Sequence, residues 1–306
     1  MAFQRSSATV RLMWAGVTKR FRDFHRSLQL TVAEVDDGTG KQLGVRQCLE
    51  RAYWGPTSAN PPGFMVGSWG KGTAIRPPND VDVFMQLPLD VYHRFDGYAG
   101  NGQSALLQEV KGHLENTYGQ TRMRGDGQVV VVGFNTVTIE VVPVFRYDDD
   151  RWVMPDTNNG GGWKNVSPSA EFRMLNSADA ASRSNARPLI QIMKAWKYHC
   201  SVPIKSFALE ILVAEFITEY QFRDQDYFYY DWFVRDFLEF LLNKRNSLVW
   251  APSSADLYNV GDEWVSRAQT AYDRAKKACD FEREDMVVSA GDEWQKIFGP
   301  RIPLLP

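Results

Sequence analysis

Two aspartates, Asp80 and Asp82, carry the clearest chemistry in this sequence of 306 residues. They alternate with the apolar residues Val81 and Val83, which is the pattern of a β-strand with one buried face. Because alternate residues of a strand point to the same side, the two carboxylates project together. Neighbouring carboxylates repel and raise each other's pKa unless a cation lies between them. A hard divalent ion with oxygen ligands, Mg²⁺ above all, relieves that repulsion, so the pattern predicts a magnesium site.

A glycine–serine pair, Gly67 and Ser68, lies between the short apolar run 64–66 and the two aspartates. Gly67 lets the backbone approach a ligand closely, and Ser68 offers a hydroxyl beside consecutive backbone N–H groups, as phosphate-binding turns do. If a short helix follows, its N-terminus adds attraction for an anion. A Gly-Ser pair alone is common in loops, and an Asp-Val-Asp alone is common on solvated edge strands. In this order and at this spacing, the two resemble the motif of the DNA polymerase β-type nucleotidyltransferases.

Glu140 is the one charged residue in the strand-like run 136–145, where it stands among β-branched residues. A lone charge in such a strand costs free energy if it is buried without a partner, so Glu140 either faces solvent or binds something. The polymerase β-type enzymes carry their third metal ligand on a later strand, and the resemblance implies that Glu140 joins Asp80 and Asp82 in this role. Those enzymes usually have aspartate at this point, and glutamate is one methylene longer.

The composition limits the classes of protein that fit. With 44% hydrophobic and 13% aromatic residues, a chain of 306 residues can bury the cores of two domains. A net charge of −2 and a pI near 6.1 argue against a protein that binds long nucleic acid. The three cysteines suggest no disulfide framework, and the four histidines lack zinc-ligand spacing. Without a signal core or an apolar run of about eighteen residues, the chain is expected to be cytoplasmic and to have no membrane partner.

The order of the predicted elements indicates an α+β fold. Helices and strands up to about residue 165 predict a polymerase β-like nucleotidyltransferase core, in which helices lie against one face of a mixed sheet. After Pro188 the pattern is helical, so the expected domains are residues 1–165 and an all-helical domain of residues 166–306. The aromatic run 227–233 has helical spacing, and such runs form core more often than base-stacking platforms.

The N-terminal region predicts one long spine helix within the first domain. Its apolar residues recur at steps of three and four, and Ser6 or Ser7 can cap its start. The stretch 36–40, Asp-Asp-Gly-Thr-Gly, is expected to end this helix. A second helix is then expected around residues 45–53.

A lysine and a serine in the helical half bear on nucleotide binding. Lys194 lies on an amphipathic helix shortly before Trp196, where a lysine most often reaches out to solvent. Ser206 opens the next helix, is followed by Phe207, and is equally suited to be an N-cap. A Lys-x-Trp helix followed by Ser-aromatic-x-Leu-Glu resembles the bacterial cGAS/DncV-like nucleotidyltransferases, with similarity from about residue 63 to 216. These are cyclic oligonucleotide synthases of anti-phage signalling, related to animal cyclic GMP-AMP synthase and oligoadenylate synthases.

The resemblance implies an enzyme that joins nucleoside triphosphates, ATP among them, into a cyclic di- or trinucleotide and releases pyrophosphate. It implies that Lys194 and Ser206 hold the donor triphosphate while Phe207 stacks on the base. Of two Mg²⁺ ions, for which Mn²⁺ can substitute, one would activate the acceptor hydroxyl and the other would grip the triphosphate. The resemblance is also compatible with a regulatory protein partner. The alternatives are a polynucleotide-directed or tRNA-tailing nucleotidyltransferase, and a toxin or antitoxin component that transfers a nucleotide to a protein.

Overall fold

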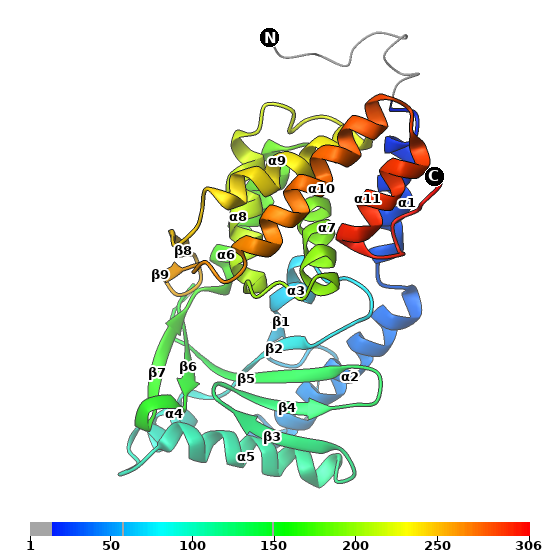
Figure 1. Cartoon of the computed structure of the whole chain (residues 1–306). Helices are drawn as coiled ribbons and strands as arrows, with labels where there is room; N and C mark the ends of the chain where they lie inside the picture. The colour runs from blue at the N-terminus through cyan, green and yellow to red at the C-terminus, as the bar shows by residue number, and fades with distance from the viewer. Residues whose placement is uncertain (1–13, 57, 149) are drawn as a thin grey trace. The chain divides into compact units, whose positions relative to one another are not determined.

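Two compact units make up the protein in this computed structural model, which describes residues 14–56, 58–148 and 150–306. The sheet unit comprises Leu30–Arg173 with Pro252–Ala255, and the helical unit comprises the described residues up to Gln29, Met174–Ala251 and Asp256–Pro306. The predicted α+β fold, with a mixed sheet and a helical C-terminal part, is confirmed (Figure 1). The predicted helix start at Ser6 or Ser7 lies outside the described residues. None of the helices in the described part of the chain has the length and apolar character needed to cross a membrane.

A seven-stranded mixed sheet forms the centre of the sheet unit. Its strands are β1 (Phe64–Met65), β2 (Val81–Gln86), β3 (Arg122–Asp126), β4 (Val129–Gly133), β5 (Thr138–Arg146), β6 (Trp152–Asp156) and β7 (Gly162–Val166). The hydrogen-bonded order is β1-β2-β5-β4-β3, with β6 beside β5 and β7 beside β6. β2 and β5 run parallel, whereas the other neighbouring strands run antiparallel. This parallel pair places side by side the two strands that position the predicted acids.

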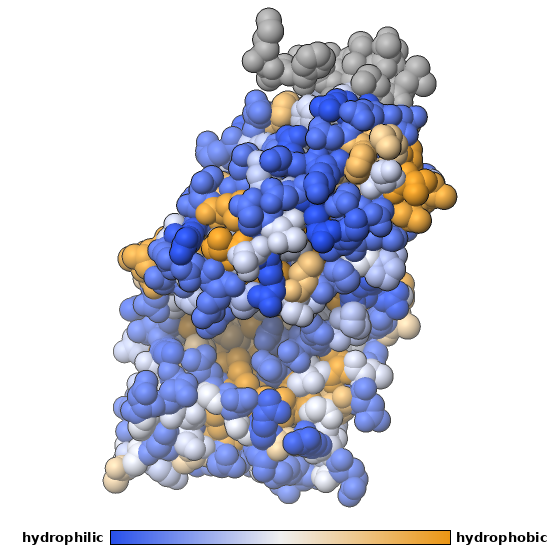
Figure 2. Space-filling model, viewed as in Figure 1, coloured by the Kyte–Doolittle hydropathy of each residue, from blue (hydrophilic) through white to orange (hydrophobic). Residues whose placement is uncertain are grey.

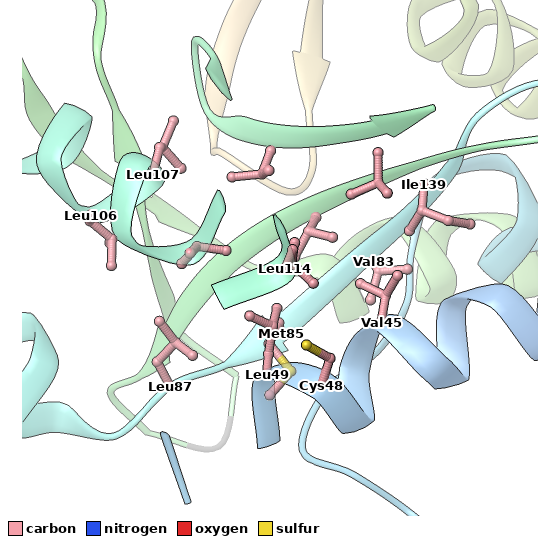
Figure 3. Packing of buried hydrophobic residues seen from close by; sticks show 14 of the residues in the cluster. Val45, Cys48, Leu49, Val83, Met85, Leu87, Leu106, Leu107, Leu114 and Ile139 are labelled. Carbon is pink, nitrogen blue, oxygen red and sulfur yellow. The ribbon is translucent and has the colours of Figure 1, made fainter. Parts of the chain in front are cut away.

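Helices cover one face of this sheet. The unit contains α2 (Val32–Tyr53), α3 (Gly67–Lys71), α4 (Leu89–Asp96), α5 (Gly102–Thr117) and η1 (Asn158–Gly160), and α6 (Pro168–Ala181) runs on into the helical unit. Apolar side chains of α2, α4 and α5 pack against alternate strand residues such as Val83 and Ile139 in one continuous core (Figure 3). Asp82 and Glu140, which are adjacent to these residues in the sequence, therefore point to the opposite face. This alternation keeps the predicted acids out of the core.

The helical unit is built around buried aromatic and aliphatic side chains. Its elements are α1 (Val17–Leu28), α7 (Ala186–His199), α8 (Ser206–Glu219), η2 (Tyr227–Tyr229), α9 (Tyr230–Leu242), β8 (Leu248–Ala251), β9 (Asp256–Asn259), α10 (Val265–Arg283) and α11 (Val287–Phe298). Tyr230 and Phe233 of the aromatic run are buried and stacked, with ring centroids 4.9 Å apart, which confirms their interpretation as core. The β8–β9 ribbon, in contrast, exposes Leu248 and Leu257, and Figure 2 shows hydrophobic surface in this region.

The predicted spine helix is two helices, α1 and α2, and the predicted break at residues 36–40 is wrong. The chain breaks earlier, where the Thr31 hydroxyl accepts a hydrogen bond from the Glu34 N–H and the Glu34 carboxylate accepts one from the Thr31 N–H. This reciprocal capping box starts α2. Residues 36–40 lie inside α2, and Gly38 leaves room there for the Trp69 ring, which would lie 2.5 Å from a Cβ at that position. Tertiary packing thus outweighs the local turn-like composition.

The helix α1 belongs to the helical unit, and the boundary between the units falls after Arg173, not after residue 165. The buried guanidinium of Arg20 on α1 donates to the Glu282 carboxylate at 2.8 Å and to the Leu304 carbonyl at 2.9 Å. These bonds connect α1 to α10 and to the C-terminal tail. The expected division into residues 1–165 and 166–306 is corrected accordingly.

Candidate active site

Asp82 and Glu140 are paired residues on the parallel strands β2 and β5. Neighbouring strands lie about 4.8 Å apart, and paired residues point to the same face of a sheet. Both side chains are half-buried, whereas Asp80, which directly precedes β2, is exposed. We call the face that carries Asp82 and Glu140 the site face. The fold therefore places the predicted carboxylates at neighbouring positions, on strands whose other face is fixed in the core.

The pKa of Glu140 depends on its burial and on the charges of the neighbouring acids. Burial raises the pKa of Glu140 from 4.5 to about 7, and the charges of Asp80, Asp82 and Asp126 add to this rise. The positive charge of Arg124 acts in the opposite direction but does not cancel them. The carboxyl group of Glu140 therefore lies in a negative potential, which is the condition that a bound cation would relieve.

The donor set suits a hard divalent ion, because it consists of carboxylate oxygens. Among the described residues, no three acidic, histidine or cysteine side chains are gathered closely enough to enclose a metal ion as they stand. Mutual repulsion favours separation of carboxylates when no cation neutralises them. The β2–β5 pairing holds the backbones of Asp82 and Glu140 at neighbouring positions, so both side chains start from the same face of the sheet. Asp80, Asp82 and Glu140 thus fit a site that closes around its cation.

Gly67 is required where it stands because the carboxylate of Asp82 lies against it. A Cβ at this position would lie 1.8 Å from Oδ2 of Asp82, and the backbone has φ +57°, which favours glycine. The N–H of Val66 also donates to the backbone carbonyl of Asp82 at 2.9 Å. Ser68 follows in the first turn of α3, and its hydroxyl has no hydrogen-bond partner among the residues that the structure describes. The predicted Gly-Ser turn and the aspartate strand therefore meet, with a free hydroxyl beside them.

Lys71, which the sequence analysis did not single out, anchors the helix that follows this turn. Its side chain is buried, and its ammonium lies 2.6 Å from the Glu171 carboxylate on α6. The neighbouring Gly70 packs so closely on the Met65 carbonyl that a Cβ would come within 2.4 Å of the oxygen. These contacts hold α3, and with it the Gly-Ser turn, against β1. The partner of Lys71 is 100 residues away, so no local pattern could have indicated this role.

Lys194, Ser206 and Phe207 lie in the helical unit. Lys194 is buried, and its ammonium lies 2.5 Å from the Glu210 carboxylate, so it does not extend into solvent as a typical surface lysine would. Ser206 is the first residue of α8 and not its N-cap. Its hydroxyl accepts a hydrogen bond from the ammonium of Lys197, which the sequence analysis missed, at 3.0 Å.

Phe207 is half-buried and packs edge-to-face against another aromatic side chain. Its ring centroid lies 4.8 Å from that of Tyr258 on β9, with 65° between the planes. The ammonium of Lys205 lies 5.4 Å from the same Tyr258 ring. An aromatic pair flanked by a cation is a surface that suits a nucleobase attached to phosphates.

Comparison with known proteins gives consistent results. Residues 16–178 match the family described as the Second Messenger Oligonucleotide or Dinucleotide Synthetase domain, SMODS. A probable cyclic nucleotide synthase of Bacillus cereus is 23% identical in an alignment of 276 positions that covers 78% of this chain and 81% of that protein. The structure of Escherichia coli CdnC in complex with HORMA-deltaN is 17% identical, covers 94% of this chain and 98% of its own, and has a TM-score of 0.70. Vibrio cholerae DncV, solved with the linear intermediate 5′ pppA(3′,5′)pG, is 13% identical over 97% of this chain and 89% of its own, with a TM-score of 0.65.

Proposed function

The chain belongs to the SMODS family of second messenger oligonucleotide or dinucleotide synthetases, and we propose on this premise that it joins nucleoside triphosphates into a cyclic di- or trinucleotide and releases pyrophosphate. The resemblance to the cGAS/DncV-like nucleotidyltransferases is confirmed by this membership. One observation above all supports the proposed chemistry. Asp82 and Glu140 are paired on adjacent parallel strands, and Gly67 lies against Asp82, so acidic oxygens stand beside a turn that a phosphate can approach.

Asp80, Asp82 and Glu140 are proposed to hold two divalent cations, Mg²⁺ or in its place Mn²⁺. Such ions would lower the pKa of the acceptor hydroxyl and neutralise charge on the departing pyrophosphate. The protein's own contribution is to position these groups, because β2 and β5 hold the carboxylates and the Gly67 turn holds the adjoining backbone. Glu140, with its pKa of about 7, must lose its proton to serve as a ligand. Phosphoryl transfer depends mainly on such positioning and charge neutralisation.

Lys194, Ser206 and Phe207 are proposed to bind the donor nucleotide, and Lys197 joins them as a second candidate for the phosphates. Lys194 would have to exchange its Glu210 contact for a phosphate. Lys197 is less buried and already hydrogen-bonded to Ser206, so the two can present an ammonium and a hydroxyl together. Phe207 would stack on the base.

ATP is proposed to be among the substrates, and the product is proposed to act as a second messenger in anti-phage signalling. Vibrio cholerae DncV was solved with an intermediate built from adenine and guanine nucleotides, which supports purine substrates. The presence of a HORMA protein in the Escherichia coli CdnC complex supports a regulatory protein partner. The second-messenger role follows the description of the family itself.

Mass spectrometry of the products formed from all four nucleoside triphosphates with Mg²⁺ or Mn²⁺ tests this function. We expect a phosphatase-resistant cyclic oligonucleotide from the wild type and none from Asp82→Asn, which should remain folded. Extended RNA would indicate the polynucleotide-directed alternative, and nucleotide-labelled protein would indicate the toxin or antitoxin alternative. A folded wild type that forms no nucleotide product with either cation would contradict the proposal.

A further inference from the structure

A row of paired residues crosses the sheet from the acidic site to the edge strand β3. Asp82 on β2 is paired with Glu140 on β5, which is in turn paired with Val131 on β4. Val131 is paired with Arg124 on β3. Because paired residues point to the same face, Arg124 lies on the site face, beyond Glu140 as seen from Asp82.

Arg122 points to the same face as Arg124, since side chains alternate along a strand. Met123, which stands between them, packs against the helix-covered core instead. Both arginines are exposed. Within the described residues, Arg122 forms no ion pair, and Arg124 pairs with Asp126 alone, at 3.2 Å. The side chains of that pair are 62% and 59% exposed, so the interaction is weak and a stronger anion can replace Asp126.

Arg124 is close enough to influence the acids. Neighbouring strands lie about 4.8 Å apart, so about 10 Å separates the backbones of β3 and β5. A long arginine side chain covers much of that distance, and the charge of Arg124 acts to lower the pKa of Glu140. Val131, between the two, is apolar. The row therefore has carboxylates at one end and a guanidinium at the other.

The following inference rests on the proposed function. In the proposed reaction all three acids hold the cation that activates the acceptor hydroxyl, whereas Asp80 and Asp82 alone hold the cation that grips the donor triphosphate. Glu140 is therefore the acid that serves the acceptor side only. The acceptor nucleotide therefore lies on the Glu140 side of Asp82, which is the side of β4 and β3. We propose that Arg122 and Arg124 bind the 5′-triphosphate of the acceptor nucleotide.

Guanidinium groups suit this task because their planar N–H donors can bind two phosphate oxygens at once. The contact also has a chemical use, since a linear intermediate can close into a ring only if it keeps a 5′-triphosphate, whose pyrophosphate then leaves. An acceptor without that group would yield a product that cannot close. Charged residues also protect exposed sheet edges from association, and a role limited to protection would leave nucleotide binding unchanged.

Calorimetric titration of a second nucleotide tests the inference. The full chain is saturated with Mg²⁺ and the non-hydrolysable ATP analogue Apcpp, which occupies the donor position. It is then titrated with GTP or guanosine and, separately, with ATP or adenosine. We expect the wild type to bind at least one triphosphate about tenfold or more tightly than the matching nucleoside, as a charge-assisted contact permits.

In the double variant Arg122→Ala/Arg124→Ala, this preference should fall toward one, while the affinity for Apcpp and the melting temperature stay as in the wild type. Lysine at both positions should restore part of the preference, because it keeps the charge and loses the fork of donors. Arg151→Ala is the matched control, since Arg151 is 64% exposed and pairs with nearby Asp148 much as Arg124 pairs with Asp126.

An undiminished preference in the double variant overturns the inference. A wild type that makes a cyclic product but binds triphosphate and nucleoside equally overturns the inference and leaves the proposed function standing. A wild type that binds neither Apcpp nor a triphosphate, and forms no nucleotide product, refutes both.

Discussion

Replacing Gly67 by alanine should disable the acidic site without altering any of its acids. The new Cβ would lie 1.8 Å from Oδ2 and 2.6 Å from Cγ of Asp82. Non-bonded heavy atoms settle at about 3.5 Å, so the carboxylate must move by about 1.7 Å or the turn must open. The backbone of Asp82 is held by β2 and by the hydrogen bond from Val66, and the displacement therefore falls mainly on the carboxylate.

The change at Gly67 has two effects of different size. The backbone there has φ +57°, and a residue with a Cβ in this left-handed region costs about 1–2 kcal/mol of stability. For a chain of 306 residues, that loss lowers the melting temperature by about 2–3 °C. Displacement of a reacting group by about 1 Å can reduce the rate by about a hundredfold. We expect Gly67→Ala to lower turnover by at least about this factor while the protein stays folded.

Gly261→Ala separates the steric effect from the backbone effect. Gly261 also has a left-handed backbone, with φ +67°, and nothing lies within 4 Å of the position that its Cβ would take. This control should lose a similar amount of stability and keep its turnover. Chromatographic measurement of product over time, together with thermal melts, compares the two variants. If Gly67→Ala forms product as fast as Gly261→Ala, the close contact with Asp82 is not a feature of the working site.

The remaining predictions concern protonation and the donor nucleotide. Because the folded pKa of Glu140, about 7, exceeds 4.5, the metal-free protein should lose stability as pH rises toward and through 7, and Mg²⁺, which needs the charged form, should bind more tightly over that range. Glu140→Gln should remove both trends in melts with and without Mg²⁺. In Apcpp titrations, Lys197→Ala and Lys194→Ala should each weaken binding by roughly ten- to a hundredfold if that lysine meets phosphate. Lys194→Ala should in addition lower the melting temperature, because it removes the ammonium that lies 2.5 Å from the buried Glu210 carboxylate. Phe207→Ala should weaken nucleotide binding through lost stacking, worth about 1–3 kcal/mol per base, with a larger effect for purines than for pyrimidines, and equal effects would argue against stacking.

The sheet and its acids could be predicted because they depend on short patterns. Alternation around Asp82 distinguishes a core face from a functional face within a few residues, and the structure has that alternation. The role of Glu140 could not be predicted from a short pattern alone, since its pairing with Asp82 depends on which strands become neighbours. Only the resemblance to a known family could supply that neighbour relation in advance, because strand order is a property of the whole chain.

The N-terminal region could not be divided correctly from local composition. The capping residues Thr31 and Glu34 were visible as a Thr-x-x-Glu pattern, and they could have indicated the start of α2. The placement of α1 could not have been found in this way, since the buried pair of Arg20 and Glu282 joins residues 262 positions apart. The same holds for Lys194, whose burial depends on how α7 meets Glu210 on α8.

The position of Glu140 in the sheet bears directly on the proposed chemistry. It lies on β5, between β2 and β4, so it is flanked on one side by Asp82 and on the other by the strand that leads to Arg124. Burial and its acidic neighbours leave it partly protonated near neutral pH. Binding of a divalent ion must therefore displace a proton from Glu140, which couples metal affinity to pH. At neutral pH Glu140 is thus fully ionised only when the cation is bound, and partial protonation before that reduces the uncompensated charge that the half-buried site carries.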